Sequence, residues 1–419
     1  MSAGKPAATT NWEVLGGEAG AGAAIARMSR ARSEANRELF EREAGRIARC
    51  CHEMAERFAR GGRLVALGAT PAARSDARHV SVEFVHPVIV GKRALPALAL
   101  TAEGGSVADQ ARAVVEADDI AIGFGAGEPG GEEVERALGE AQDRGCMTLA
   151  FPPGHGAPLS GWDFAPPGED PMIRQELVET LYHVLWELVH VFFDHRGLLA
   201  GRKERATHDA GASSFLYPFL AEAESDLDSV LDDVRRSVLL KSEEIGELRE
   251  STLRESASGL IAAAAALRAR LEAGGTLLAL GNGGSATDAM DVVADFRDTS
   301  GGRWGAHPAI DLTEDTPILT AVANDVGVEE IFQRQVIALG REGDALIAFS
   351  TSGGSENLIE ALAQARRQGI ETIAMVGYDG GRIASGHLAD HVVVVSSQNI
   401  PRIQEAQASA YHALRELVA

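Results

Sequence analysis

The stretch LLALGNGGSATDAMDVVAD, residues 277–295, decides the fold of this chain. A short apolar run ends at Gly281, residues 282–284 (NGG) allow a tight backbone turn, and Ser285 stands where a helix begins. The start of such a helix has free N–H groups that bind an anion well. The stretch therefore predicts an α/β unit with a phosphate-binding loop.

A second loop of the same kind follows. After a predicted strand at residues 345–349, the sequence STSGGS (350–355) precedes the helical pattern ENLIEALAQARRQG. This junction offers four hydroxyls, and neither loop contains the lysine of a nucleotide-binding P-loop. Two such loops in one unit favour a phosphorylated sugar over a nucleoside triphosphate.

Length and composition indicate a soluble two-domain protein of 419 residues, with 45% hydrophobic and 24% charged residues. The net charge of -22 argues against general nucleic-acid binding, because a polyanion would be repelled. Loop N–H groups and hydroxyls can still hold an anion locally. We therefore expect a sugar phosphate as partner, and no nucleic acid.

The sequence gives no sign of membrane insertion or secretion. No apolar run approaches the roughly 20 residues of a spanning helix, and the first thirty residues lack a signal-peptide core. The three cysteines cannot form a disulfide framework, and the adjacent pair at residues 50–51 suits helix packing. We expect a cytoplasmic protein without membrane partners.

The chain contains two copies of one unit. Residues 61–68 (GGRLVALG) match residues 274–281 (GGTLLALG), and two later segments match in the same order, from Asp118 with Gly343 and from Arg174 with Ile403. Each copy is predicted to be a three-layer α/β/α sandwich with a mostly parallel sheet. In the first copy the loops have lost almost all hydroxyls and gained Glu128, so we expect poor phosphate binding there.

Four segments are predicted. They are a disordered N-terminus at 1–32, a diverged first copy at 33–196, a linker at 197–224 and the second copy at 225–419.

The segments GNGGSATDAM, TAVANDVG, GREGDALIAFSTSGGS and RIQEAQASAYH resemble the SIS (sugar isomerase) family, within it the phosphoheptose isomerase (sedoheptulose 7-phosphate isomerase) branch, over residues 235–419. The resemblance implies a phosphosugar isomerase that interconverts a ketose phosphate and an aldose phosphate through an enediolate. The same branch contains the DnaA-associating SIS protein, whose role is binding rather than catalytic turnover of a substrate. A non-catalytic sugar-phosphate-binding or protein-interaction module is therefore the alternative.

Matching positions in the two copies suggest a metal site. The helix after the first loop carries an i, i+4 pair in each copy, which puts both side chains on one face. The resemblance implies a divalent metal, usually zinc, bound by a His and a Glu of that helix and a Gln and a His of the last helix. The first copy fits residue for residue, with His79, Glu83, Gln175 and His183, whereas the second copy has Asp291, Asp295, Gln404 and His412.

Spacing on the last helix bears on where a metal could sit. Residues 404 and 412 lie eight apart, about 12 Å along a helix, so one ion is held more easily when two copies contribute. We hypothesise a pseudo-dimer in which the second copy supplies phosphate loops and the first supplies metal ligands. The sequence allows three locations for the metal site: the first copy, the second copy, or a site shared by both. Relatives form tetramers of single domains, so the resemblance implies a homo-oligomer, a dimer of tandem chains.

Roles follow from the same resemblance. The acid-base pair is expected to be Asp295 with His412 in the second copy or Glu83 with His183 in the first, with loss of catalysis as a third option because aspartate is shorter than glutamate. Substrate contacts are expected from Asn282, Gly283, Gly284, Ser285, Asn324, Asp325, Ser350, Thr351, Ser352, Ser355 and Gln404.

Overall fold

The computed structural model describes residues 18–88, 92–101, 103–152, 154, 161–194, 226–298 and 305–418. Its contacts divide the chain into two compact units. We call residues 34–246 the N-terminal unit, and residues 1–33 with 247–419 the C-terminal unit. The expected linker at 197–224 lies outside the described residues.

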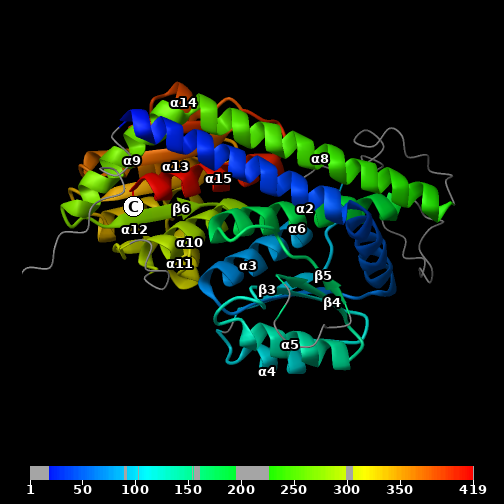
Figure 1. The fold of residues 1–419 in the computed structure, drawn as a ribbon. Coiled ribbons are helices and arrows are strands. Elements are labelled where there is room, and N and C mark those ends of the chain that lie inside the picture. The colour runs from blue at the N-terminus through cyan, green and yellow to red at the C-terminus, as the bar shows by residue number, and fades with distance from the viewer. Residues whose placement is uncertain are drawn as a thin grey trace, which may run out of the picture. The chain divides into compact units, whose positions relative to one another are not determined.

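The N-terminal unit is a parallel sheet in the order β2-β1-β3-β4-β5, covered by helices on both faces. In Figure 1, α3 and α6 lie on one side of this sheet and α4 and α5 on the other. The elements are α2 (Glu18–Arg60), β1 (Leu64–Gly68), α3 (Pro71–Val85), β2 (Ala97–Leu100), α4 (Val107–Val114), β3 (Ile120–Phe124), α5 (Glu132–Asp143), β4 (Met147–Phe151), β5 (Trp162–Asp163) and α6 (Pro171–Asp194).

The C-terminal unit repeats this topology, with its strands in the order β7-β6-β8-β9-β10, all parallel. The elements are α8 (Leu227–Glu255), α9 (Ala257–Glu272), β6 (Leu277–Gly281), α10 (Gly284–Arg297), β7 (Ala309–Asp311), α11 (Thr316–Asp325), η2 (Val328–Glu330), α12 (Gln333–Leu339), β8 (Ala345–Ser350), α13 (Glu356–Arg367), β9 (Glu371–Gly377), α14 (Gly381–Ser385), β10 (His391–Val395) and α15 (Ile400–Val418).

The strand register confirms the duplication. Gly68 of β1 pairs with Phe124 of β3, and at the matching positions Gly281 of β6 pairs with Phe349 of β8. Successive residues of β6 enter different cores: Leu277 packs with residues of α9, α10 and α15, whereas Leu278 packs with residues of α12 and α13. Both sheets are therefore buried on two faces, as the sequence predicts for a three-layer α/β/α sandwich.

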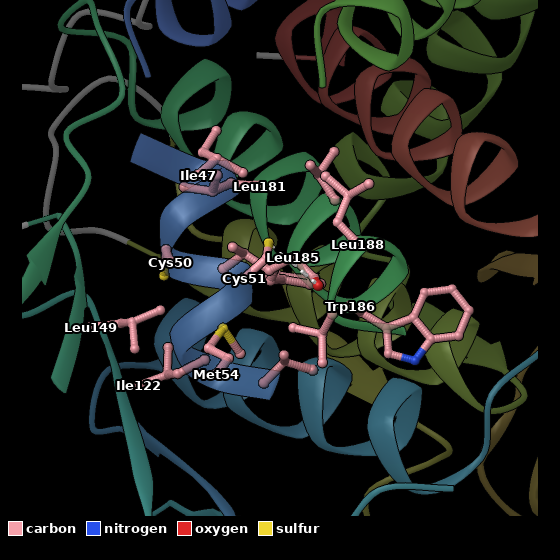
Figure 2. Close-up of a cluster of buried hydrophobic side chains, with 14 of the residues drawn as sticks. Ile47, Cys50, Cys51, Met54, Ile122, Leu149, Leu181, Leu185, Trp186 and Leu188 are labelled. Atoms are coloured by element: carbon pink, nitrogen blue, oxygen red, sulfur yellow. Dashed lines mark hydrogen bonds between the residues drawn. The ribbon is translucent and has the colours of Figure 1, made fainter. Parts of the chain in front are cut away.

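The adjacent cysteines belong to the core, as predicted. Figure 2 shows Cys51 of α2 beside Leu185 of α6, whereas Cys50 and Met54 lie on the side of α2 nearer Leu149 and Ile122. All three cysteines of the chain are free and buried. Burial raises the pKa of the Cys50 and Cys51 thiols, so both stay protonated and serve packing.

The predicted disorder of residues 1–32 is wrong for residues 18–32, which form the start of α2; residues 1–17 lie outside the described part of the chain. Alanine has the highest helix propensity, and Ala21 and Ile25 are buried in the core of the C-terminal unit. Conversely, the start of α8 places Val230 and Val234 in the core of the N-terminal unit. Each long helix thus begins in one unit and ends in the other, which the boundary at 225 did not foresee.

No helix of the described residues is long and apolar enough to cross a membrane.

Candidate functional site

Two loops meet at the carboxyl edge of the C-terminal sheet. The first joins β6 to α10 and the second joins β8 to α13, and β6 and β8 are hydrogen-bonded neighbours. Carboxyl ends of adjacent parallel strands are where α/β proteins bind ligands. The two loops predicted from the sequence therefore lie side by side.

An amide pair joins these loops. Asn282 Nδ2 donates to Asn357 Oδ1 at 3.0 Å, and Asn357 Nδ2 donates to Asn282 Oδ1 at 2.9 Å. Asn282 was predicted from the sequence as a substrate contact, whereas Asn357 was not. The available signal was an amide in the first turn of the helix that follows the hydroxyl-rich loop.

The hydroxyls of the second loop divide into two groups. Ser350 Oγ accepts from the Gly353 amide at 3.0 Å and Ser352 Oγ accepts from the Gly354 amide at 3.2 Å, so these two fix the shape of the loop. Ser355 precedes α13, and Thr351 is half-buried. The Ser355 hydroxyl does not cap the start of α13.

The first loop leaves open space over the start of α10. Gly283 has φ +58, a conformation that favours glycine, and a Cβ there would meet nothing within 4 Å. Gly284 begins α10 without a side-chain cap, and Ser285 is buried beside it. Uncapped helix starts leave N–H groups available to an anion.

Asn324 and Asp325, which the sequence analysis expects to contact the substrate, lie in the last turn of α11. Both side chains are exposed, and Asn324 Nδ2 donates to Asp325 Oδ1 at 2.7 Å.

Two residues of the C-terminal unit that the sequence proposes as an acid-base pair, Asp295 and His412, lie close together. His412 Nε2 of α15 lies 3.8 Å from Asp295 Oδ2 of α10; the imidazole is buried, whereas the carboxylate is 23% exposed. Burial raises the pKa of Asp295 to about 6, against the lowering effect of His412 and Arg415. Such a carboxylate is ionised at neutral pH and is a stronger base than an exposed aspartate.

A third carboxyl on α10 escaped sequence reasoning. Asp288, Asp291 and Asp295 are spaced i, i+3, i+7 and therefore share one helix face. Asp288 is 3% exposed, and burial raises its pKa to about 8. Asp291 and Gln404 are also buried. The spacing was visible in the sequence, but the burial was not.

The N-terminal unit holds a cluster that could bind a metal. Candidate ligand atoms of His79, Glu83 and His183 all lie within 4.8 Å of one another, and all three side chains are at least 97% buried. His79 Nε2 lies 3.4 Å from His183 Nε2 and 3.8 Å from Glu83 Oε1. Two nitrogens bound tetrahedrally at about 2.05 Å from zinc would be about 3.3 Å apart, so the imidazole spacing fits.

Tyr182 orients the His79 ring. Its hydroxyl lies 2.8 Å from His79 Nδ1, which leaves Nε2 facing His183 and Glu83. Burial, and then the neighbouring His183, lower the pKa of His79. The neutral imidazole that results is the form that ligates a metal.

Asp291, Asp295 and His412, the predicted His and Asp ligands of the second copy, do not form a comparable cluster within the described part of the chain. Among the described residues, the cluster of the N-terminal unit is the single group of three His, Cys, Asp or Glu side chains with candidate ligand atoms this close together. Gln175 is half-buried on α6, and His412 has Asp295 within 4 Å but no comparable third ligand from those residue types. Within the described part, the group of His, Cys, Asp or Glu side chains that could bind a metal therefore belongs to the first copy.

The C-terminal unit also has close sequence relatives. The family profile described as SIS domain matches residues 242–377. The phosphoheptose isomerase of Nitratidesulfovibrio vulgaris is 39% identical over 186 residues, which cover 44% of this chain and 88% of that protein. The chain belongs to the SIS domain family. The SIS resemblance that the sequence motifs indicated is thereby confirmed.

Further comparisons extend this result. The phosphoheptose isomerase of Roseiflexus sp. is 40% identical over 195 residues, 46% of this chain and 96% of that protein. The solved C-terminal domain of glucosamine-fructose-6-phosphate aminotransferase from Francisella tularensis covers 93% of this chain and 95% of its own, with a TM-score of 0.57 and 10% identity. At that identity the likeness concerns the fold alone. With the two matching sheets, it confirms a tandem of two SIS-type units.

Proposed function

We propose that this chain is a phosphosugar isomerase that interconverts a ketose phosphate and an aldose phosphate, with a seven-carbon ketose phosphate as the preferred substrate. One arrangement in the C-terminal unit carries the proposal. Two hydroxyl-bearing loops lie at the ends of adjacent strands, and each leads into a helix without a side-chain cap. The Asp295–His412 pair lies on helices of the same unit. The relatives named phosphoheptose isomerase support the choice of substrate.

The reaction uses this unit's own groups. The loops bind the phosphoryl group through helix-start amides and the Ser355 hydroxyl. Ten residues of α10 separate Ser285 from Asp295, about 15 Å of helix, so an extended substrate suits the span better than a compact one. Asp295 removes the proton from the carbon beside the carbonyl while His412 gives a proton to the carbonyl oxygen, and His412 then takes back the hydroxyl proton of the deprotonated carbon, whose C–O bond becomes the new carbonyl. Asp295 then returns the proton to the neighbouring carbon.

A divalent metal, zinc by its donor set, is proposed for the His79–Glu83–His183 cluster. When bound, such an ion supplies Lewis-acid stabilisation of an oxyanion. The chain's own contribution is a buried pair of imidazoles and a carboxylate, oriented by Tyr182.

Solvent isotope exchange tests the activity. The purified chain is incubated in D2O with sedoheptulose 7-phosphate, fructose 6-phosphate or tagatose 6-phosphate, and deuterium at the carbon beside the carbonyl is followed by NMR. Exchange with at least one substrate, absent in Asp295→Asn, is the expected result. If the chain binds these sugar phosphates but catalyses deuterium exchange with none of them, the proposed isomerase activity is refuted.

A non-catalytic sugar-phosphate binder is the second candidate. It is favoured by the carboxylates at Asp291 and Asp295, where the family pattern has His and Glu. It predicts the same phosphate binding with neither exchange nor product.

We also propose that the chain forms a homodimer. Apolar side chains remain 40–61% exposed over α11, η2 and α12, namely Ile318, Val326, Val328, Ile337 and Leu339. Sedimentation equilibrium at micromolar protein tests this, and a monomer there would refute it.

A further inference from the structure

The N-terminal unit carries an acidic residue in the loop that corresponds to the hydroxyl-rich loop of the C-terminal unit. This loop joins β3 to α5, as the other joins β8 to α13. The Glu128 amide donates to the Gly125 carbonyl at 3.0 Å, and the Glu128 carbonyl accepts from the Gly131 amide at 2.9 Å. Two turn hydrogen bonds therefore fix the backbone from which the Glu128 side chain extends.

A cation from the last helix of the unit holds this carboxylate. Arg174 Nη2 lies 2.9 Å from Glu128 Oε1, and the two side chains are only 28% and 35% exposed. Arg174 stands at the position that Ile403 occupies in the second copy. Arg174 Nε is buried and has no hydrogen-bond partner among the described residues, so the guanidinium has an unused donor.

The carboxylate also lies close to α3, the helix that follows the first loop. Asp76 of α3 is 7% exposed; burial and then the charge of Glu128 raise its pKa. Gly68 lies against the Ala73 carbonyl just as Gly281 lies against the Ser285 carbonyl, so Ala73 and Ser285 occupy matching positions. Asp76 and Asp288 each lie three residues further along the helix and are therefore counterparts. The Glu128 carboxylate thus lies close enough to α3 to act on Asp76, near the region where the C-terminal unit presents its anion-binding groups.

The first turn of α3 is also less open than that of α10. Thr70 Oγ1 accepts from the Ala73 amide at 3.4 Å, and Pro71 has no N–H to offer. In α10 the Ser285 amide donates to the Asn282 carbonyl at 3.1 Å, so the difference between the two helix starts is the missing N–H of Pro71.

We propose that Glu128, held by Arg174, is a built-in anion that fills the phosphoryl position of the N-terminal unit and excludes phosphorylated ligands from it. In this loop the negative charge that a bound phosphate would supply comes from the Glu128 carboxylate, which pairs with Arg174. Removal of the Glu128 charge would free Arg174 for an external phosphate, because a guanidinium binds carboxylate and phosphate in similar ways.

Glycine amide signals can report each loop separately. The full chain, selectively labelled with ¹⁵N-glycine, is titrated with inorganic phosphate. In the wild type, shifts are expected at Gly283 and Gly354, but not at Gly125 and Gly130. In Glu128→Gln and in Glu128→Ala, the N-terminal glycines should also shift, with apparent affinity about tenfold or more above wild type at that loop.

Two further variants control the interpretation. Glu132→Gln removes a nearby exposed charge on α5 and should leave the N-terminal glycines silent. Adding Arg174→Gln to Glu128→Gln should abolish the gain. Wild-type shifts at Gly125 and Gly130, or folded Glu128 variants that gain no binding, would overturn the proposal. Silent C-terminal glycines would instead contradict the phosphate site of the proposed function.

Discussion

The raised pKa of Asp295 makes its carboxylate a stronger base but lowers the stability of the folded protein at neutral pH. The variant Asp295→Asn tests both effects, through turnover and through the free energy of unfolding. The side chain is half-buried beside His412, with 23% of its surface exposed, and partial burial raises its pKa from 3.8 to about 6. A rise of about two in pKa corresponds to about 3 kcal/mol between the two protonation states. Because the carboxylate is partly exposed, water screens some of this cost, so we expect Asp295→Asn to stabilise the protein by about 2 kcal/mol at pH 7.5.

The sign of the pH dependence follows from linkage. The folded-state pKa is the higher one, so between pH 4 and 6 the folded state binds more protons than the unfolded state. The stability of the wild type should therefore fall, relative to Asp295→Asn, as the pH rises from about 4 to 6, and the difference should stay constant above. Contributions from all other groups cancel in the comparison.

Urea unfolding followed by circular dichroism at pH 4.5, 5.5, 6.5 and 7.5 tests this. The matched control is Asp143→Asn, at an exposed aspartate on α5, which should change stability by less than about 0.5 kcal/mol at every pH. Turnover of Asp295→Asn should fall by about 10²- to 10⁴-fold. A variant no more stable than wild type at pH 7.5 would show that the Asp295 carboxylate is not desolvated in the folded protein.

Three further outcomes are expected. His79→Ala and His183→Ala should lose the bound metal of the purified chain by plasma mass spectrometry, and Tyr182→Phe should weaken affinity by about tenfold or more through loss of ring orientation; equal metal content in all variants would contradict the cluster. Unchanged turnover in the two histidine variants would contradict the predicted sharing of metal and phosphate groups. Lys241→Met should destabilise the chain by about 3 kcal/mol in urea, because it removes the Lys241 ammonium from the Glu187 carboxylate, which is 1% exposed, whereas Lys241→Arg should retain most of the stability. Asn357→Ala should weaken phosphate binding by breaking the amide pair between the loops, and calorimetry showing unchanged affinity would remove that pair from the binding site.

The sequence predicted most of the regular structure because those signals are local. The apolar run and glycine turn at residues 277–284 indicated the strand and the loop, and the internal match indicated the duplicated topology. Residues of one helix face follow from spacing, so the sequence alone places His79 and Glu83 together on one face of a helix. The metal roles of those residues came from the resemblance rather than from the pattern.

Tertiary structure decided which distant groups meet. His183 reaches His79 across 104 residues, and Asn357 reaches Asn282 across 75, through helices whose side-chain period says only which face is covered. The sequence also did not predict that the start of α2 belongs to the C-terminal unit. Its alanine-rich composition suggested disorder, but Ala21 and Ile25 are buried in the core of that unit. Burial of Asp288 and the pairing of Glu128 with Arg174 have the same origin: the cost of a buried charge and the identity of its partner depend on the neighbours that folding supplies.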